Sequence, residues 1–215
     1  MKNYVITISD IEQSVQIAKR CIQSAASHGT LVEHFEAITP RNTDIYAMAE
    51  KEGISIDGFK EVYSRLDNCL AAFLSHYSIW KLAAESYQPT TIFEHDAVVV
   101  NQLNSTIPFD KVVCLGKPSY GRYNTPTTLG TGPLVHKPYF GGAHAYRINR
   151  SGAEELIKQA KIQARPTDVF MNVNTFPWLQ EHYPWKVEVK ESFSTIQKTE
   201  GCLAKHGYGE SYELL

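Results

Sequence analysis

Apolar residues near the start of the chain change their spacing twice, and this predicts a strand, a helix and a second strand. Tyr4-Val-Ile-Thr-Ile8 is a short apolar run typical of a buried strand. Apolar residues then recur at helical spacing to about His28, and Ser9 with Glu12 forms a capping-box pattern at the expected helix start. Residues 31–37 resemble a second strand. This order favours a parallel sheet with helices packed on it.

The longest amphipathic pattern lies in the middle of the chain. Residues 66–86 carry a wide apolar stripe that predicts a helix, after a shorter helical pattern at 44–52. Residues 90–93 then read as a buried strand, which Glu94-His95-Asp96 follows directly. Because open α/β sheets bind ligands beyond the carboxyl ends of their strands, this tripeptide is a candidate site.

A long segment rich in Gly, Pro, Tyr and Thr follows a further predicted strand at 111–115. It covers residues 116–142, and a loop of this length is typical of a lid or binding loop. Aromatic and basic side chains suit sugars and phosphates, although an irregular solvated loop is an equal alternative. The candidates are Tyr120, Arg122, Tyr123, His136, Lys137 and Tyr139.

The remaining chain predicts a strand at 143–149 and a helix at 151–163, with Ser151 as N-cap and Glu154 as its capping-box partner. Asp168 opens a short element, where it is either functional or an exposed helix cap. Little apolar periodicity is left from about residue 195, which indicates a partly ordered tail.

Composition limits the class of protein. The 215 residues fit one α/β domain, 43% hydrophobic and 20% charged, and the net charge of -2 gives no broad basic surface for nucleic acid or anionic membrane. Without a leader-like start or a stretch of about 20 apolar residues, we expect a cytoplasmic protein with at most peripheral membrane contact. The four scattered cysteines form no CxxC pair, so we expect reduced core thiols.

The acidic tripeptide is chemically suggestive but weak by itself. Glu94 and Asp96, one residue apart in a turn, can both face a pocket while His95 points elsewhere. Mg²⁺ and Mn²⁺ take oxygen ligands and often complete their shell with water and substrate phosphates. The alternative is a solvated turn after a strand.

Several motifs in a fixed order strengthen the functional interpretation. They are Tyr4-Val-Ile-Thr-Ile8, Phe35-Glu-Ala37, the segment from Asn68 to Trp80 with its Cys-x-x-x-x-x-Ser-His-x-x-x-Trp pattern, Glu94-His95-Asp96, the Gly142 to Ala153 stretch and Pro166-Thr-Asp168. Over about residues 3–175 this set resembles glycosyltransferase family 25, the lipopolysaccharide and procollagen galactosyltransferase group.

The resemblance implies a GT-A fold, with a mostly parallel central sheet flanked by helices in a single domain. It also implies a metal-dependent, inverting transfer of a hexose, galactose or glucose, from a nucleotide-diphosphate sugar such as a UDP-sugar. The acceptor would be a glycan or a lipid-linked sugar, and the cofactor Mn²⁺ or Mg²⁺.

Site residues carry over by position. Asp96 would bind the metal, and Glu94 would lie nearer the donor ribose or a metal-bound water; Asp168 would be the catalytic base. The expected donor site also includes Ser75, His76, His95, Gly142 and His144. We expect His76 to be buried and hydrogen-bonded below the site and Trp80 to lie in the core, while His144 could equally contact the donor or solvent. His206 is a further candidate metal ligand.

The chain also departs from the family pattern. His95 stands where the family has its middle Asp, only Asp10 remains of an Asp-Arg-Arg stretch, and Asn68 replaces a Gly. An alternative is therefore a catalytically inactive scaffold that binds a nucleotide sugar or glycan. A metal-dependent phosphohydrolase ranks last, since it needs more carboxylates.

Overall fold

The computed structural model describes residues 1–60, 65–103 and 106–190 of the chain. The predicted tail, Cys202 and His206 lie outside these residues. In chain order the elements are β1 (Lys2–Thr7), α1 (Glu12–Ser27), β2 (Glu33–Glu36), α2 (Ile45–Glu52), η1 (Asp57–Phe59), α3 (Leu66–Ala84), β3 (Thr90–Glu94), β4 (Ala97–Val99), β5 (Val112–Cys114), β6 (Gly130–Pro133), β7 (Ala145–Ile148), α4 (Arg150–Ala160), α5 (Thr167–Phe170), β8 (Gln180–Tyr183) and β9 (Val187–Val189).

A seven-stranded sheet forms the centre of the protein, in the order β2-β1-β3-β7-β5-β8-β6. Strand β1 pairs in parallel with β2 and β3, and β5 pairs in parallel with β8. Strands β7 and β6 run the opposite way. The predicted α/β class with a mostly parallel sheet is therefore confirmed, and a small antiparallel pair of β4 and β9 accompanies it.

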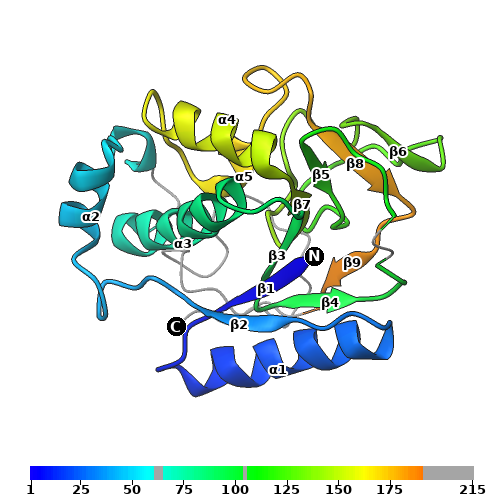
Figure 1. Cartoon of the computed structure of the whole chain (residues 1–215), viewed down its shortest axis with the longest axis horizontal. Coiled ribbons are helices and arrows are strands. Elements are labelled where there is room, and N and C mark those ends of the chain that lie inside the picture. Colours follow the sequence, from blue (N-terminus) through cyan, green and yellow to red (C-terminus); the bar gives the residue numbers. More distant parts are fainter. Residues whose placement is uncertain (61–64, 104–105, 191–215) are drawn as a thin grey trace.

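Helices cover both faces of the sheet because its central strands are apolar on both sides. Val5 and Phe93 pack with α1 in one core, whereas Tyr4 and Ile92 pack with α3 and α4 in the other. Figure 1 shows α1 on one side of the sheet and α2, α3 and α4 on the other. The carboxyl ends of β1 and β3 thus open between two helical layers.

Helix α3 is the central packing element, and it confirms the predicted helix to within two residues. Its Phe73 and Trp80 are fully buried, and their rings meet edge to face at 5.5 Å. Phe170 of α5 stacks on Trp80 at 5.6 Å, which fixes α5 against α3. Trp80 is a core residue, as predicted.

Both predicted capping boxes are wrong. Helix α1 begins at Glu12 without a side-chain cap, and the Ser9 hydroxyl donates to Glu36 of β2 instead. In α4 the cap is Asn149, whose side-chain oxygen accepts from the Gly152 amide at 3.0 Å. Ser9 is thus drawn to a distant strand, whereas in α4 a residue two positions before Ser151 takes the capping position.

The segment at 116–142 is less irregular than predicted, because it contains β6. Strands β4, β8 and β9 were not predicted either; each has only three or four residues. Cys21, Cys69 and Cys114 are buried, as expected. Among the described residues, no helix is long and apolar enough to cross a membrane.

Candidate functional site

Glu94 ends β3 at the carboxyl edge of the sheet, beside the start of β7. Its amide donates to the His144 carbonyl at 3.0 Å, directly beyond the last paired residues of the two strands, Phe93 and Ala145. Residues 94 and 144, far apart in the sequence, are therefore neighbours at this edge.

A buried chain of hydrogen bonds leads from the core to the Glu94 carboxylate. The Trp80 indole donates to the Tyr146 hydroxyl at 2.7 Å, and that hydroxyl lies 2.9 Å from His76 Nδ1. Since an indole N–H can only donate, the Tyr146 proton is available to His76 Nδ1, which leaves His76 Nε2–H to donate to Glu94 Oε1 at 3.1 Å. The prediction that His76 is buried and hydrogen-bonded below the site is confirmed.

The environment of Glu94 favours its ionised form. Burial opposes ionisation, but the hydrogen bond that His76 donates, together with electrostatic interactions with the neighbouring histidines, outweighs burial and lowers the pKa of Glu94. The side chain remains 35% exposed. Glu94 thus offers a fixed carboxylate to a ligand at the sheet edge.

His95 turns to the opposite side of the sheet. Its Nδ1 lies 2.8 Å from the Ser14 hydroxyl of α1, and Ser14 also accepts from the Ile8 amide. Burial lowers the pKa of His95 to about 4, although Glu94 opposes this shift. The ring is therefore neutral near pH 7 and ties the turn to α1.

Asp96 also lies toward α1. Burial and the nearby Asp96 carboxylate raise the pKa of Cys21 in α1 to about 12, and the Asp96 Oδ1 atom is buried. Glu94 contacts α3, so the two carboxylates lie toward different helical layers. In the described part of the chain, no three His, Cys, Asp or Glu side chains gather to hold a metal ion.

Two glycines make room for His144. A Cβ atom at Gly116 would lie 2.3 Å from His144 Nε2, and one at Gly142 would lie 2.9 Å from Nδ1. Gly142 also has φ +107°, which few other residues adopt. Burial lowers the pKa of His144 to about 4. His144 is 1% exposed, so it lies under the surface of the site rather than on it.

Asp168 lies in a cluster with the aromatic and basic side chains of the predicted lid. Its Oδ1 accepts from the Val169 amide at 2.8 Å, and the Tyr120 hydroxyl donates to Oδ2. Lys137 Nζ lies 4.8 Å from the Tyr120 ring centre and 5.4 Å from that of Tyr139. Burial lowers the pKa of Lys137, and Asp168 opposes that shift.

The Asp168 cluster connects to the sheet edge through the loop before Tyr120. The Ser119 amide and hydroxyl both donate to the Gly141 carbonyl, at 2.7 and 3.1 Å. The Ser119 hydroxyl also packs so closely on Gly142 that a Cβ atom there would lie 2.4 Å from it. His144 lies two residues after Gly142. Four of the predicted site residues, His76, Glu94, Gly142 and His144, therefore lie together at the sheet edge, and Asp168 is connected to them through Tyr120 and Ser119.

Ser75 bonds to the segment after β2 rather than to Glu94. It is buried, accepts from the Ile38 amide at 2.9 Å and donates to the Ala71 carbonyl at 2.9 Å. These bonds fasten α3 to the segment after β2, so any effect of Ser75 on a ligand is indirect.

One buried hydrogen-bonded pair was not predicted. Glu181 of β8 accepts from His136 Nδ1 at 2.8 Å and from the amides of Val135 and His136 at 2.6 and 2.9 Å. Burial works against ionisation, yet these donors lower the pKa of Glu181. The pair anchors the second half of the 116–142 segment. A lone Glu in a segment without periodicity gave no signal for it.

Comparison with known proteins identifies the chain. No curated protein matches it. A family model described as glycosyltransferase family 25 (LPS biosynthesis protein) matches residues 1–112. The match includes Ser75, His76 and the Glu94 to Asp96 turn, but ends before His144 and Asp168. Because it extends over half of the sequence, the chain belongs to glycosyltransferase family 25.

Proposed function

We propose that the protein transfers a hexose, galactose or glucose, from a UDP-sugar to a hydroxyl group of a glycan or lipid-linked sugar, with inversion at the anomeric carbon. Family membership implies a glycosyltransferase in general. The observation that carries the finer proposal is that Glu94, fixed by His76, is connected through His144 and Gly142 to the loop that leads to the Asp168 cluster. We further assign the sheet, with its reversed strand β7, to the GT-A type.

The donor would bind at the carboxyl edge of β1 and β3, as ligands do in open α/β sheets. Glu94 is ionised and partly exposed there, so it can accept hydrogen bonds from sugar or ribose hydroxyls. Gly142 and the buried His144 shape the wall next to it.

Asp168 would act as the base. The acceptor oxygen attacks the anomeric carbon, the bond from that carbon to the diphosphate breaks, and the acceptor proton passes to the Asp168 carboxylate. The nucleoside diphosphate leaves with the bonding electron pair. Tyr120 and the Val169 amide hold the carboxylate in place for this transfer.

A divalent ion, Mn²⁺ or Mg²⁺, is a separate part of the proposal. Such an ion offsets charge on a leaving diphosphate as a Lewis acid. Glu94 and Asp96 are directed to different layers and do not form a shared pair. Asp96 would hold the ion, and Glu94 would lie closer to the donor ribose.

The alternative is an inactive scaffold that binds a nucleotide sugar or glycan. It is favoured by His95, which is neutral and turned to Ser14 instead of adding a carboxylate to the site. Binding and transfer measurements separate the two functions.

The test combines calorimetry of UDP, with and without Mn²⁺, and an assay of UDP-galactose and UDP-glucose hydrolysis or transfer. We expect binding and turnover by the wild type, both weakened in Glu94→Gln and Asp96→Ala. Glu33→Gln is the matched control, because Glu33 is exposed at the other end of the parallel strand β2. Binding without turnover supports the scaffold, and absence of UDP binding refutes both the transferase and a scaffold that binds a nucleotide sugar.

A further inference from the structure

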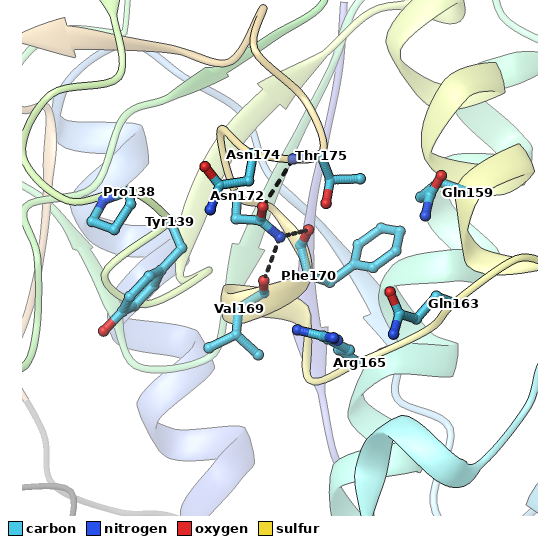
Figure 2. Close-up of a pocket in the computed structure, with 10 residues that line it drawn as sticks. All are labelled: Pro138, Tyr139, Gln159, Gln163, Arg165, Val169, Phe170, Asn172, Asn174 and Thr175. Carbon is cyan, nitrogen blue, oxygen red and sulfur yellow. Dashed lines mark hydrogen bonds between the residues drawn. The ribbon is translucent and has the colours of Figure 1, made fainter.

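A pocket lined by both polar and apolar side chains lies next to the Asp168 cluster, on the α3 and α4 side of the sheet. It has a volume of about 410 Å³ and opens between the end of α4, the short helix α5 and the turn after it. Figure 2 shows side chains from these segments facing a common space. That volume is of the size that small ligands occupy.

The pocket wall is rich in amides. Gln159, Gln163 and Asn174 offer both hydrogen-bond donors and acceptors, and Tyr139 adds an aromatic ring. Asn172 builds the floor: its Nδ2 donates to the carbonyls of Val169 and Phe170 at 2.9 and 3.1 Å, and its Oδ1 accepts from the Thr175 amide at 3.0 Å. Hydroxyl-rich ligands such as sugars match this combination of amides and an aromatic face.

Arg165 gives the pocket a positive charge. It is the one charged side chain among the ten described residues that line the pocket, and within the described chain it forms no ion pair. A Cβ at Gly58 would lie 3.2 Å from Arg165 Cγ, so the stem of the side chain packs closely on η1 while the guanidinium group faces the pocket. A guanidinium group binds phosphate or carboxylate through paired hydrogen bonds.

The pocket is joined to the proposed base. Val169 and Phe170, which line it, follow Asp168 directly in α5. Tyr139 lies in the pocket wall and also stacks on Tyr120, the residue that donates to Asp168. A sugar in the pocket would therefore be close to Asp168 without occupying the edge near Glu94.

We propose that this pocket is the acceptor subsite and that it takes a sugar carrying an anionic group, either a phosphate or a carboxylate. The inference rests on the proposed function, since it supplies the acceptor for that transfer. Arg165 would bind the anion, and the amides would bind the ring hydroxyls.

The test compares the binding of glucose 6-phosphate, glucuronate and methyl glucoside by ligand-observed NMR, with UDP present. We expect the two anionic sugars to bind better than the neutral one, and Arg165→Gln to weaken them by about tenfold, as loss of a charge-assisted contact predicts. The stronger of the two anions identifies the group. Lys158→Gln removes an exposed charge in the last turn of α4, outside the pocket lining, and should leave binding unchanged.

Equal binding of the neutral sugar, equal losses in both variants, or no binding of any probe overturns the inference. UDP binding, measured on the same samples, should be the same in the wild type and Arg165→Gln. If UDP binds normally but the anionic preference is absent, only the acceptor subsite is refuted. If UDP fails to bind the wild type, the proposed donor function is refuted, whatever the sugars do.

Discussion

His76 Nε2 lies 3.1 Å from Glu94 Oε1, and this contact connects the hydrophobic core to the carboxyl edge of the sheet. His76 is itself held through Nδ1 by Tyr146, which also accepts from Trp80. Because Trp80, Tyr146 and His76 are all buried, the position of the Glu94 carboxylate depends on side chains that no ligand would touch.

Removing the Tyr146 hydroxyl, which is central to these hydrogen bonds, should weaken both the fold and the site. Tyr146→Phe keeps the ring but leaves the Trp80 indole and His76 Nδ1 without their partner, which should lower the free energy of unfolding by about 1–3 kcal/mol. With His76 less well fixed, the pKa of Glu94 should rise toward its usual value. Urea denaturation and carboxyl ¹³C NMR titration measure these effects.

Tyr87→Phe provides the control, because Tyr87 is 93% exposed. It should alter neither quantity. A Tyr146→Phe protein with wild-type stability and an unchanged Glu94 titration would show that the hydrogen bonds from Trp80 through Tyr146 and His76 do not position the Glu94 carboxylate.

Two neutral histidines should make stability depend on pH. The pKa values of His95 and His144 are both lowered to about 4 in the folded protein, mainly by burial, against about 6.5 when unfolded. The unfolded chain therefore binds more protons between these values, so their contribution is complete above about pH 6.5 and is lost as the pH falls toward 4.

We expect the unfolding free energy to rise with pH across that window. Gln cannot titrate, so His144→Gln should reduce the slope of unfolding free energy against pH by the amount that corresponds to about one bound proton. This holds whatever the effect of the substitution on absolute stability. Urea unfolding at several pH values gives the slope. A curve for His144→Gln that runs parallel to that of the wild type would contradict the assignment.

The helices and strands with a clear pattern of apolar residues were predictable from sequence. Helix α3 and strand β3 follow from an apolar stripe and an apolar run, and their burial explains why the pattern was decisive. The position of Glu94 at a carboxyl edge followed from the same reasoning. His76 was predicted to be buried and hydrogen-bonded below the site, but Glu94 was not predicted as its partner.

The features that were missed depend on contacts between distant residues. Strands β6 and β8 are short and polar, so neither shows the alternation by which a strand is recognised. Glu181 and His136 meet across 45 positions, and only the folded sheet brings them together. The direction of Asp96, toward α1 rather than Glu94, likewise depends on the turn geometry.

Breaking the Glu181 pair should be costly because it leaves a buried histidine and two amides without their acceptor. We expect Glu181→Ala to lower the free energy of unfolding by about 3–5 kcal/mol, because three buried donors lose their acceptor at once. Glu188→Ala, which removes a half-exposed partner of Lys117, should cost at most about 1 kcal/mol. Equal losses in urea denaturation would contradict this difference. Faster hydrogen exchange at Val135 and His136 should accompany the Glu181 change.

Asp168 should affect the chemical step more than donor binding. Asp168→Asn keeps the size of the side chain and can still accept from the Val169 amide, but it cannot take a proton. We expect kcat for UDP-sugar hydrolysis, in which water replaces the acceptor, to fall by about 10²–10⁴-fold, while UDP binding by calorimetry stays within error. Tyr120→Phe should produce a smaller loss, because it removes only the group that orients the carboxylate.

Asp67→Asn, exposed in the first turn of α3, is the control for loss of one carboxylate charge. If Asp168→Asn turns over like Asp67→Asn, Asp168 is not the base, and the buried Tyr120 and Lys137 contacts serve only to hold α5 in place.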